Sequence, residues 1–366
     1  MMQVVMKGAG LLGLFVVAFG IATPSAAQLR QTTPSDLEEP GSVVVFPKFT
    51  KGTVAVDRVT RVATEIEVSA QCPRDARCSE NELVKVRFHW VCPGSEDISA
   101  KHICKDAAFS LVLPIGGKAS FNPEDSRPVG DVVGAIPPCT KGYLIGWVID
   151  PITDRPIKYD GLTGTAVLRD SRGTIDSYEA ITVPAEPNLA ARADIATDID
   201  SRTGSPALVF DGAAGHYQAV ASAVPLNLVH HKFTGPLSSS EAVLTVLTLD
   251  VRLDRPNYPT FIDLDFAGEA GAHTSASWEF TCWTEIQNPK IEASFTLAGA
   301  RLRNGIVISG QAIKVPVAGI SDIPGPVALL GLVRADKGHE HPTMSPAYII
   351  KTFDDSKPTT VFLPFD

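Results

Sequence analysis

Apolar and polar residues alternate along much of the chain, most clearly between residues 83 and 114. The segment LVKVRFHWVC (83–92) places apolar side chains at every second position, with basic residues and a histidine between them. Alternation with a period of two predicts a half-buried β-strand. A second apolar run, AFSLVL (108–113), follows a polar loop, so we expect a β-hairpin. Because Cys92 ends the first strand and Cys104 opens the second, a disulfide is expected to close the loop.

Strand-length apolar runs recur through the rest of the sequence. The run GYLIGWVI (142–149) is unbroken, which predicts a strand buried on both faces. The run VVVFPKF (43–49) contains Pro47, whose missing backbone donor predicts an edge strand or a β-bulge. Helix is expected only within NLAARADIA (188–196), for a turn or two. Further strands are expected at 60–70, 165–169, 174–183, 207–210, 216–224, 242–253, 260–266, 274–283, 291–297, 305–309, 313–317, 327–333, 347–352 and 359–364.

Short strands separated by turn residues predict an all-β fold. The 28 prolines and 29 glycines suit tight turns better than long helices. We expect one large or two tandem antiparallel β-sandwich domains, Ig-like or jelly-roll-like, with disulfide-clipped loops. A strand–loop–strand pattern near a Trp/Cys pair occurs in both halves, which reflects either a duplication or the general likeness of hairpins. The expected boundaries are a signal peptide (1–27), a flexible leader (28–40), a first domain (41–185), a linker (186–205) and a second domain (206–366), separate from the first or merged with it.

The N-terminus has the pattern of an export signal. Lys7 provides a positive start, residues 9–22 are largely apolar, and Ser25-Ala26-Ala27 supplies the small residues that signal peptidase needs. We expect cleavage after Ala27. An uncleaved membrane anchor is the alternative, but the apolar run is shorter than the roughly 20 residues that span a bilayer. The mature chain is then expected to contain no transmembrane span and to reside in the periplasm, on the cell surface or outside the cell.

The charge of the chain limits its partners. The formal net charge is −9, and removing residues 1–27, which hold one lysine and no acidic residue, makes it −10. A negative charge opposes binding to nucleic acid and to anionic lipid. The sequence leaves the partner itself unknown, with a protein and a carbohydrate as the two candidate classes.

All six cysteines follow the predicted cleavage site. They are Cys72, Cys78, Cys92, Cys104, Cys139 and Cys282. An even number of cysteines after an export signal predicts three disulfides in an oxidising compartment. The short separations favour Cys72–Cys78 and Cys92–Cys104, which leaves Cys139–Cys282 as a long connection. The absence of CxxC and CxxCH disfavours zinc and excludes covalent haem, so no cofactor is predicted.

Three residues near the C-terminus are weak candidates for a metal site. His339 and His341 flank Glu340, and imidazole and carboxylate groups are common ligands of zinc and copper. A glycine and a proline border the three residues, so a solvated loop is the alternative. Two acidic stretches, 150–160 and 194–200, offer oxygens for calcium but lack the EF-hand spacing, and such aspartates commonly form turns.

No catalytic motif stands out in the sequence. GxSxG, the Walker loop, GxGxxG and HExxH are absent, although a Ser/His/Asp triad has no fixed spacing. Asp263, Asp265 and Glu179 offer carboxylates for a glycosidase, but the two aspartates alternate with apolar residues and suit an exposed strand face. The four tryptophans suit either a sugar-binding platform or, for the three within strand-like runs, the core. We therefore expect no pocket in which two ionisable side chains converge beside an apolar wall.

These patterns favour an exported, non-enzymatic β-sandwich protein that acts as a surface or periplasmic binding or structural module. A secreted carbohydrate-active hydrolase is the first alternative, and a small metal-binding exported protein is the second. Acids and aromatic rings gathered in one groove would favour the hydrolase. An exposed, unpaired edge strand would favour assembly with another chain.

Overall fold

Every regular element that the structure describes is a β-strand. The computed structural model describes residues 39–54, 61–79, 81–94, 104–124, 136–170, 173–199, 206–220, 223–226, 241–249, 251, 260–267, 273–287, 306–309, 329–336, 347–350 and 362–364. No helix occurs among these residues, and the sheets are antiparallel. The all-β prediction is confirmed for this part of the chain. Because these residues include no helix, none of them forms a helix that could cross a membrane.

Two sheets form the first half of the described chain. The first sheet contains, in spatial order, β10 (Ile181–Val183), β1 (Val43–Thr50), β7 (Lys141–Ile149), β4 (Leu83–Gly94) and β5 (Cys104–Pro114). The second sheet contains β2 (Thr53–Val54), β3 (Arg61–Ala70), β8 (Leu162–Asp170) and β9 (Gly173–Glu179), and β6 (Lys118–Phe121) pairs with β3. The hairpin predicted at 83–114 is the β4–β5 pair, in which Phe88 lies opposite Phe109.

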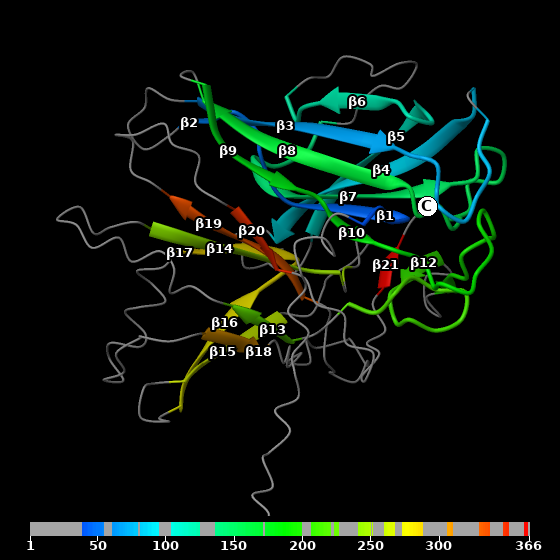
Figure 1. Cartoon of the computed structure of the whole chain (residues 1–366). Helices are drawn as coiled ribbons and strands as arrows, with labels where there is room; N and C mark the ends of the chain where they lie inside the picture. Colours follow the sequence, from blue (N-terminus) through cyan, green and yellow to red (C-terminus); the bar gives the residue numbers. More distant parts are fainter. Residues whose placement is uncertain are drawn as a thin grey trace, which may run out of the picture. The chain divides into compact units, whose positions relative to one another are not determined.

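Side chains from both sheets fill one core. Phe88 of β4, Ile66 of β3 and Leu168 of β8 belong to the same cluster, and none of them is exposed. The Phe88 ring lies 5.3 Å from the Phe109 ring and 5.7 Å from the Phe121 ring, between centroids. Figure 1 shows β3 and β8 lying over β7 and β1. The alternate apolar positions of residues 83–92 therefore face this core, as the sequence predicts.

Strand β1 shows how the sheet accommodates Pro47. The first part of β1 pairs with β10 on one side and β7 on the other, so β1 is an interior strand and the edge-strand alternative is wrong. The pairing with β7 shifts register between Phe46 and Phe49, which places a bulge at the proline. The bulge alternative is correct, because a bulge tolerates the missing backbone donor without ending the strand.

Strand β7 is buried on both faces, as its unbroken apolar run predicts. Leu144 and Val148 face the core between the two sheets, whereas Tyr143 and Trp147 face a second cluster. Gly142 is required by close approach, since a Cβ there would lie 2.1 Å from the carbonyl oxygen of Val91. A side chain at this position would collide with backbone that cannot move aside.

Three further sheets occur in the second half. Their strands, each sheet in spatial order, are β13 (Ala223–Leu226), β18 (Ile306–Ser309), β15 (Thr260–Ala267) and β16 (His273–Phe280); β17 (Trp283–Gln287), β14 (Glu241–Thr248), β19 (Leu329–Asp336) and β20 (Ala347–Ile350); and β11 (Asp198–Ile199), β12 (Pro206–Val209) and β21 (Phe362–Pro364). The strand expected at 216–224 is only partly formed. Tyr217, which is fully buried, makes isolated β-bridges, and the strand β13 begins only at Ala223. The strands predicted at 291–297 and 313–317 lie outside the described residues.

The second core cluster contains side chains from both halves of the sequence. Trp147 of β7 shares it with Leu208, Leu247 and Trp283. Residues 32–366 cluster as one compact unit. The boundaries expected for two tandem domains and for the leader stay predictions.

The helical turn expected within residues 188–196 is wrong. This stretch forms turns and a single bridge instead. Its backbone groups bond to a distant segment: the Lys158 N–H donates to the Ala193 carbonyl at 2.9 Å, and the Ile195 N–H donates to the Pro156 carbonyl at 2.8 Å. These long-range bonds replace the i→i+4 bonds that a helix would need.

The disulfide pairing differs from the prediction in two of three bonds. Cys72–Cys78 is correct, but Cys92 pairs with Cys139 and Cys104 with Cys282. Cys139 packs against the core between the two sheets, whereas Cys104 and Cys282 belong to the second cluster. The disulfides of Cys92 and Cys104 therefore lie on opposite faces of the sheet that contains the β4–β5 hairpin. Two cysteines can form a disulfide with each other only if both sulfur atoms lie on the same face.

Candidate functional site

A partly buried ion cluster joins β17 to two neighbouring strands of the first sheet. Glu285 of β17 binds Lys48 of β1 through Oε1 and Lys141 of β7 through Oε2, the latter at 3.0 Å. Burial would raise the pKa of Glu285, but the charges of Lys48 and Lys141 outweigh it and lower the pKa to about 2. Beside this cluster, the indole N–H of Trp283 donates to the Pro47 carbonyl at 2.7 Å. The single carboxylate bridges two ammonium groups and so connects β17 to β1 and β7 of the first sheet.

A second buried cation, Lys158, organises the surrounding loops. Its ammonium group donates to the carbonyls of Glu186, Pro187 and Leu189 at 3.4, 3.2 and 2.8 Å. Its nearest carboxylate oxygens are those of Asp75 at 3.3 Å and Asp160 at 3.7 Å. Only 4% of the Lys158 side chain is exposed, so these bonds replace the water that the charge has lost.

Asp160, whose carboxylate lies 3.7 Å from the Lys158 ammonium group, connects Lys158 to a second set of hydrogen bonds. Burial raises the pKa of Asp160, while hydrogen bonds from the Ser42 hydroxyl at 2.6 Å and the Ala185 N–H at 2.8 Å act in the other direction. The Ser42 hydroxyl also accepts the Tyr159 N–H at 2.8 Å. Asp160 therefore fixes two chain segments, and its raised pKa has a structural cause.

His89 forms the acid–histidine pair nearest to a catalytic arrangement. Its Nδ1 lies 2.9 Å from Asp106 Oδ2, and its ring stacks on Trp147 with centroids 5.1 Å apart. Burial, and to a lesser degree the charge of Asp106, raises the pKa of the neighbouring Tyr143, which keeps this phenol neutral. His89 Nε2 is buried, and within the part of the chain that the structure describes it has no hydrogen-bond partner, a serine hydroxyl included.

An open hollow of about 240 Å³ lies where β3, β6 and β8 meet. Arg169 Nε lies 2.7 Å from Glu65 Oε2 there, and Phe121 contributes an apolar wall. The expectation that no pocket brings two ionisable side chains together beside an apolar wall is therefore wrong. The Arg169 and Glu65 side chains are 52% and 47% exposed and lie on the neighbouring strands β8 and β3. They therefore form an ordinary cross-strand ion pair.

The candidates proposed from sequence fall in different parts of the molecule. His339, Glu340 and His341 lie outside the described residues. Among the residues that the structure describes, no three His, Cys, Asp or Glu side chains come close enough to share a metal ion. All six cysteines form disulfides. Asp263 and Asp265 lie in β15, and Glu179 lies at the end of β9.

The structural alternatives hold for the acidic turn at Asp150 and for two of the three tryptophans in strand-like runs, whereas the third, Trp278, is only half-buried. Asp150 Oδ1 accepts the N–H groups of Ile152 and Thr153 at 2.9 and 2.7 Å, and these bonds lower the pKa of Asp150. Asp150 is therefore a turn former. Trp90 and Trp147 are at most 1% exposed, which confirms core packing for both.

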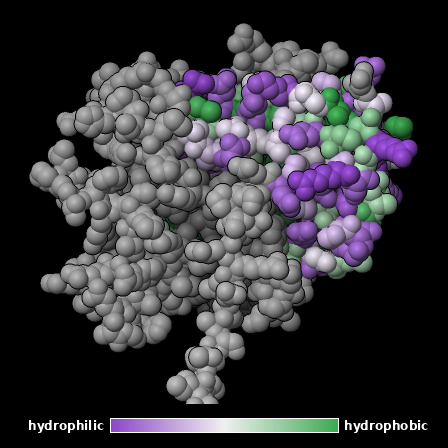
Figure 2. All heavy atoms as spheres, in the orientation of Figure 1, coloured by the Kyte–Doolittle hydropathy of each residue, from purple (hydrophilic) through white to green (hydrophobic). Residues whose placement is uncertain are grey.

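An exposed apolar patch lies at one end of the first sheet. We define it by Leu83, Val112 and Ile152, which are 60%, 49% and 90% exposed. The register places Val112 of β5 and Ile149 of β7 on either side of Lys85. Lys85 also binds Asp154 in the turn that carries Ile152, at 2.6 Å. On the face of the molecule that Figure 2 shows, the hydrophobic residues of the described surface form small groups among hydrophilic ones.

The patch borders the outer edge of β5. This strand ends its sheet and, among the residues that the structure describes, pairs only with β4. Residues 107–113, AAFSLVL, carry no charge. Natural edge strands commonly carry charges or prolines that prevent pairing with other chains, whereas β5 has these only near its ends, at Lys105, Asp106 and Pro114. The signal available in the sequence was Val112, an apolar residue at a position where alternation calls for a polar one.

Neither a known protein family nor a curated protein matches this chain in sequence comparison. The proposals below therefore rest on its residues and geometry.

Proposed function

We propose that this chain is an exported β-sandwich protein that binds another polypeptide by strand addition at the outer edge of β5. Closure of all six cysteines into three disulfides supports an oxidising compartment. The core shared by the β10-β1-β7-β4-β5 sheet and the β2-β3-β8-β9 sheet supports the sandwich arrangement.

One observation carries the binding proposal: an edge strand whose residues 107–113 carry no charge lies beside the exposed apolar patch. A segment that extends along β5 gains backbone hydrogen bonds, each with a net value of about 0.5–1.5 kcal/mol. Its side chains alternate between the two sheet faces, so those on the outer face cover Val112 and Leu83. Burying these apolar groups contributes about 25 cal/mol per Å². The partner is therefore an extended segment with apolar residues at alternate positions.

The buried ionisable groups have structural roles in this proposal. Glu285 bridges Lys48 and Lys141, and the Lys158 ammonium group donates to backbone carbonyls of a loop. Strand addition needs only a rigid edge and a complementary face, and it assigns no catalytic residue. The Cys104–Cys282 disulfide begins at the first residue of β5 and so helps to hold that edge in place.

Site-specific photocrosslinking in the exporting host tests the binding proposal. A photoreactive residue at Val112 or Leu83 should crosslink to a polypeptide, which mass spectrometry then identifies, a second copy included. Ile199 of β11 is a matched control because it is an apolar strand residue with 63% exposure. Val112→Lys should abolish the crosslink from position 83, with the fold retained because the side chain is at the surface. Equal crosslinking at 112 and 199, or none at 112, would refute strand addition at β5.

Export is tested separately by the mature N-terminus. Mass spectrometry of protein from the exporting host should show a chain that begins at Gln28. Protein that retains Met1 and stays in the cytoplasm would refute export.

A further inference from the structure

The Cys72–Cys78 disulfide is the most accessible of the three. It closes the short loop CPRDARC, with a sequence separation of 6. Cys72 is exposed and Cys78 is half-buried. In contrast, Cys104 and Cys282 are 0% and 1% exposed, and the Cys92–Cys139 bond has one cysteine at 2%. Thiol–disulfide exchange requires a thiolate to reach a sulfur atom, so exposure decides which bond reacts first.

The loop carries two exposed arginines, of which Arg74 lies 3.7 Å from the carboxylate of Glu39. Arg74 and Arg77 are both exposed, and the Arg74 side chain reaches 89%. Positive charge attracts an incoming thiolate and stabilises the thiolate that leaves. Asp75, the one acidic residue between the two cysteines, is directed to the buried ammonium group of Lys158 at 3.3 Å. The negative charge of Asp75, which would repel an anionic thiolate, is thus partly neutralised by Lys158.

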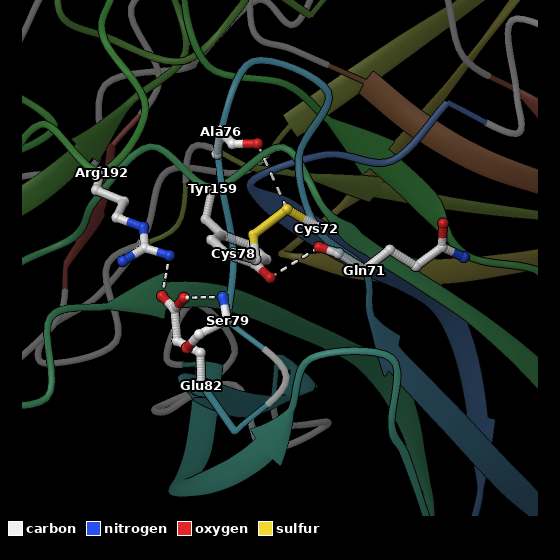
Figure 3. The surroundings of a disulfide bond; sticks show 8 residues. All are labelled: Gln71, Cys72, Ala76, Cys78, Ser79, Glu82, Tyr159 and Arg192. Atoms are coloured by element: carbon white, nitrogen blue, oxygen red, sulfur yellow. Dashed lines mark hydrogen bonds and ion pairs between the residues drawn. A yellow bond between two sulfur atoms is a disulfide. The ribbon is translucent and has the colours of Figure 1, made fainter.

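The loop is anchored to the fold by contacts that do not depend on its disulfide. The Tyr159 hydroxyl donates to the Gln71 carbonyl at 2.7 Å, and Glu82 binds Arg192 on the other side, as Figure 3 shows. The Lys158 ammonium group keeps its three carbonyl partners whether or not Asp75 stays in place. Opening this bond therefore frees the loop tip and leaves the two sheets intact.

We propose that Cys72–Cys78 is a thiol–disulfide exchange site for an external dithiol, such as the reduced form of a thiol–disulfide oxidoreductase. A thiolate of the dithiol attacks Cys72 Sγ, the bond between Cys72 and Cys78 breaks, and its electron pair leaves on Cys78 Sγ, which takes a proton from water. The second thiol of the dithiol then loses its proton to water and attacks the dithiol sulfur of the mixed disulfide, which releases Cys72 Sγ as a thiolate that takes up a proton. Two electrons pass from the dithiol, now a disulfide, to the two cysteines.

Timed reduction of the oxidised, folded protein tests this assignment. The protein is treated with dilute dithiothreitol and quenched with an alkylating reagent, and the labelled peptides are quantified by mass spectrometry. Cys72 and Cys78 should become labelled at least about tenfold faster than the other four cysteines. Reduced glutathione, a monothiol, should leave its mixed disulfide on Cys72. Equal or faster opening of Cys92–Cys139, or a mixed disulfide mainly on Cys78, would overturn the proposal.

The role of the arginines needs its own variant. Arg74→Glu together with Arg77→Glu should slow the reaction with anionic glutathione by about tenfold and the reaction with neutral 2-mercaptoethanol by less. Arg155→Glu is a matched control because its side chain is 71% exposed in a different loop. An equal effect of the control variant, or no effect of the double replacement, would contradict the proposed charge contribution.

Discussion

Replacement of Glu285 tests how the second half of the chain is held to the first sheet. The carboxylate of Glu285 binds Lys48 and Lys141, and 15% of its side chain is exposed. Glu285→Gln keeps the size of the side chain and removes its charge. Lys48, whose side chain is 5% exposed, then loses the carboxylate that balances it.

Two independent arguments give a similar magnitude for the stability that Glu285→Gln should lose. Burial acts to raise the pKa of Glu285, but the charges of Lys48 and Lys141 lower it from the usual 4.5 to about 2. This difference of about 2.5 corresponds to about 3 kcal/mol of extra stability for the charged carboxylate in the folded state. Removal of one member of a buried ion pair also costs about 3–5 kcal/mol. We expect Glu285→Gln to lower the free energy of unfolding by about 3 kcal/mol at neutral pH.

The stability that Glu285→Gln loses should become smaller as the pH falls. Because the pKa of Glu285 is lower in the folded than in the unfolded state, its contribution is fully present above the unfolded value of 4.5 and disappears as the pH falls toward 2. Glutamine does not titrate in this range. The difference between the native protein and the variant should therefore shrink between about pH 5 and pH 3. Urea unfolding followed by tryptophan fluorescence measures this difference at each pH.

Two further variants make the test decisive. Glu65→Gln removes an exposed carboxylate from its cross-strand pair with Arg169, and should cost less than about 1 kcal/mol. Lys48→Met combined with Glu285→Leu removes both charges and should recover most of the loss. The reasoning fails if Glu285→Gln costs no more than Glu65→Gln, or if its cost is unchanged at low pH.

Three other predictions follow from the core and the covalent connections. Replacing Cys104 and Cys282 together by alanine opens a connection across 178 residues and should lower the free energy of unfolding by about 5 kcal/mol, as measured in urea; a loss below about 2 kcal/mol would contradict the loop-entropy argument. Gly142→Ala places a Cβ 2.1 Å from the Val91 carbonyl oxygen and should cost about 2 kcal/mol or more in thermal unfolding, so an unchanged midpoint would contradict the close approach. Lys158→Met removes the buried donor to three backbone carbonyls and should cost about 2 kcal/mol, with faster amide exchange in residues 186–195; unchanged exchange would show that Lys158 does not hold this loop.

Local patterns predicted the two central strands and the faces that they bury. Residues 83–92 and 142–149 lie in β4 and β7; the alternate apolar side chains of β4 from Val84 to Trp90 face the core between the two sheets, and β7 is buried on both faces. Pro47 correctly indicated a disruption, but the sequence could not distinguish an edge from a bulge. That distinction depends on whether β10 pairs with the other side of β1, which is a contact across more than a hundred residues.

The disulfide pairing shows where short-range reasoning fails. Separation along the chain favours Cys92–Cys104, yet the sheet directs these two side chains to different faces. The buried ions were missed for a similar reason. Lys48 and Glu285 stand 237 positions apart, and each alone suggests an exposed residue.

The sequence by itself determined the class of fold, the faces of its strands, the even set of cysteines and the signal-like N-terminus, because each of these is encoded in neighbouring residues. The tertiary structure alone decided which strands are neighbours, which cysteines meet, which charges are buried in pairs and that β5 lies at an edge. These outcomes depend on contacts between residues far apart in the chain. A local pattern specifies what a strand can bury, but the whole arrangement of sheets selects its neighbour.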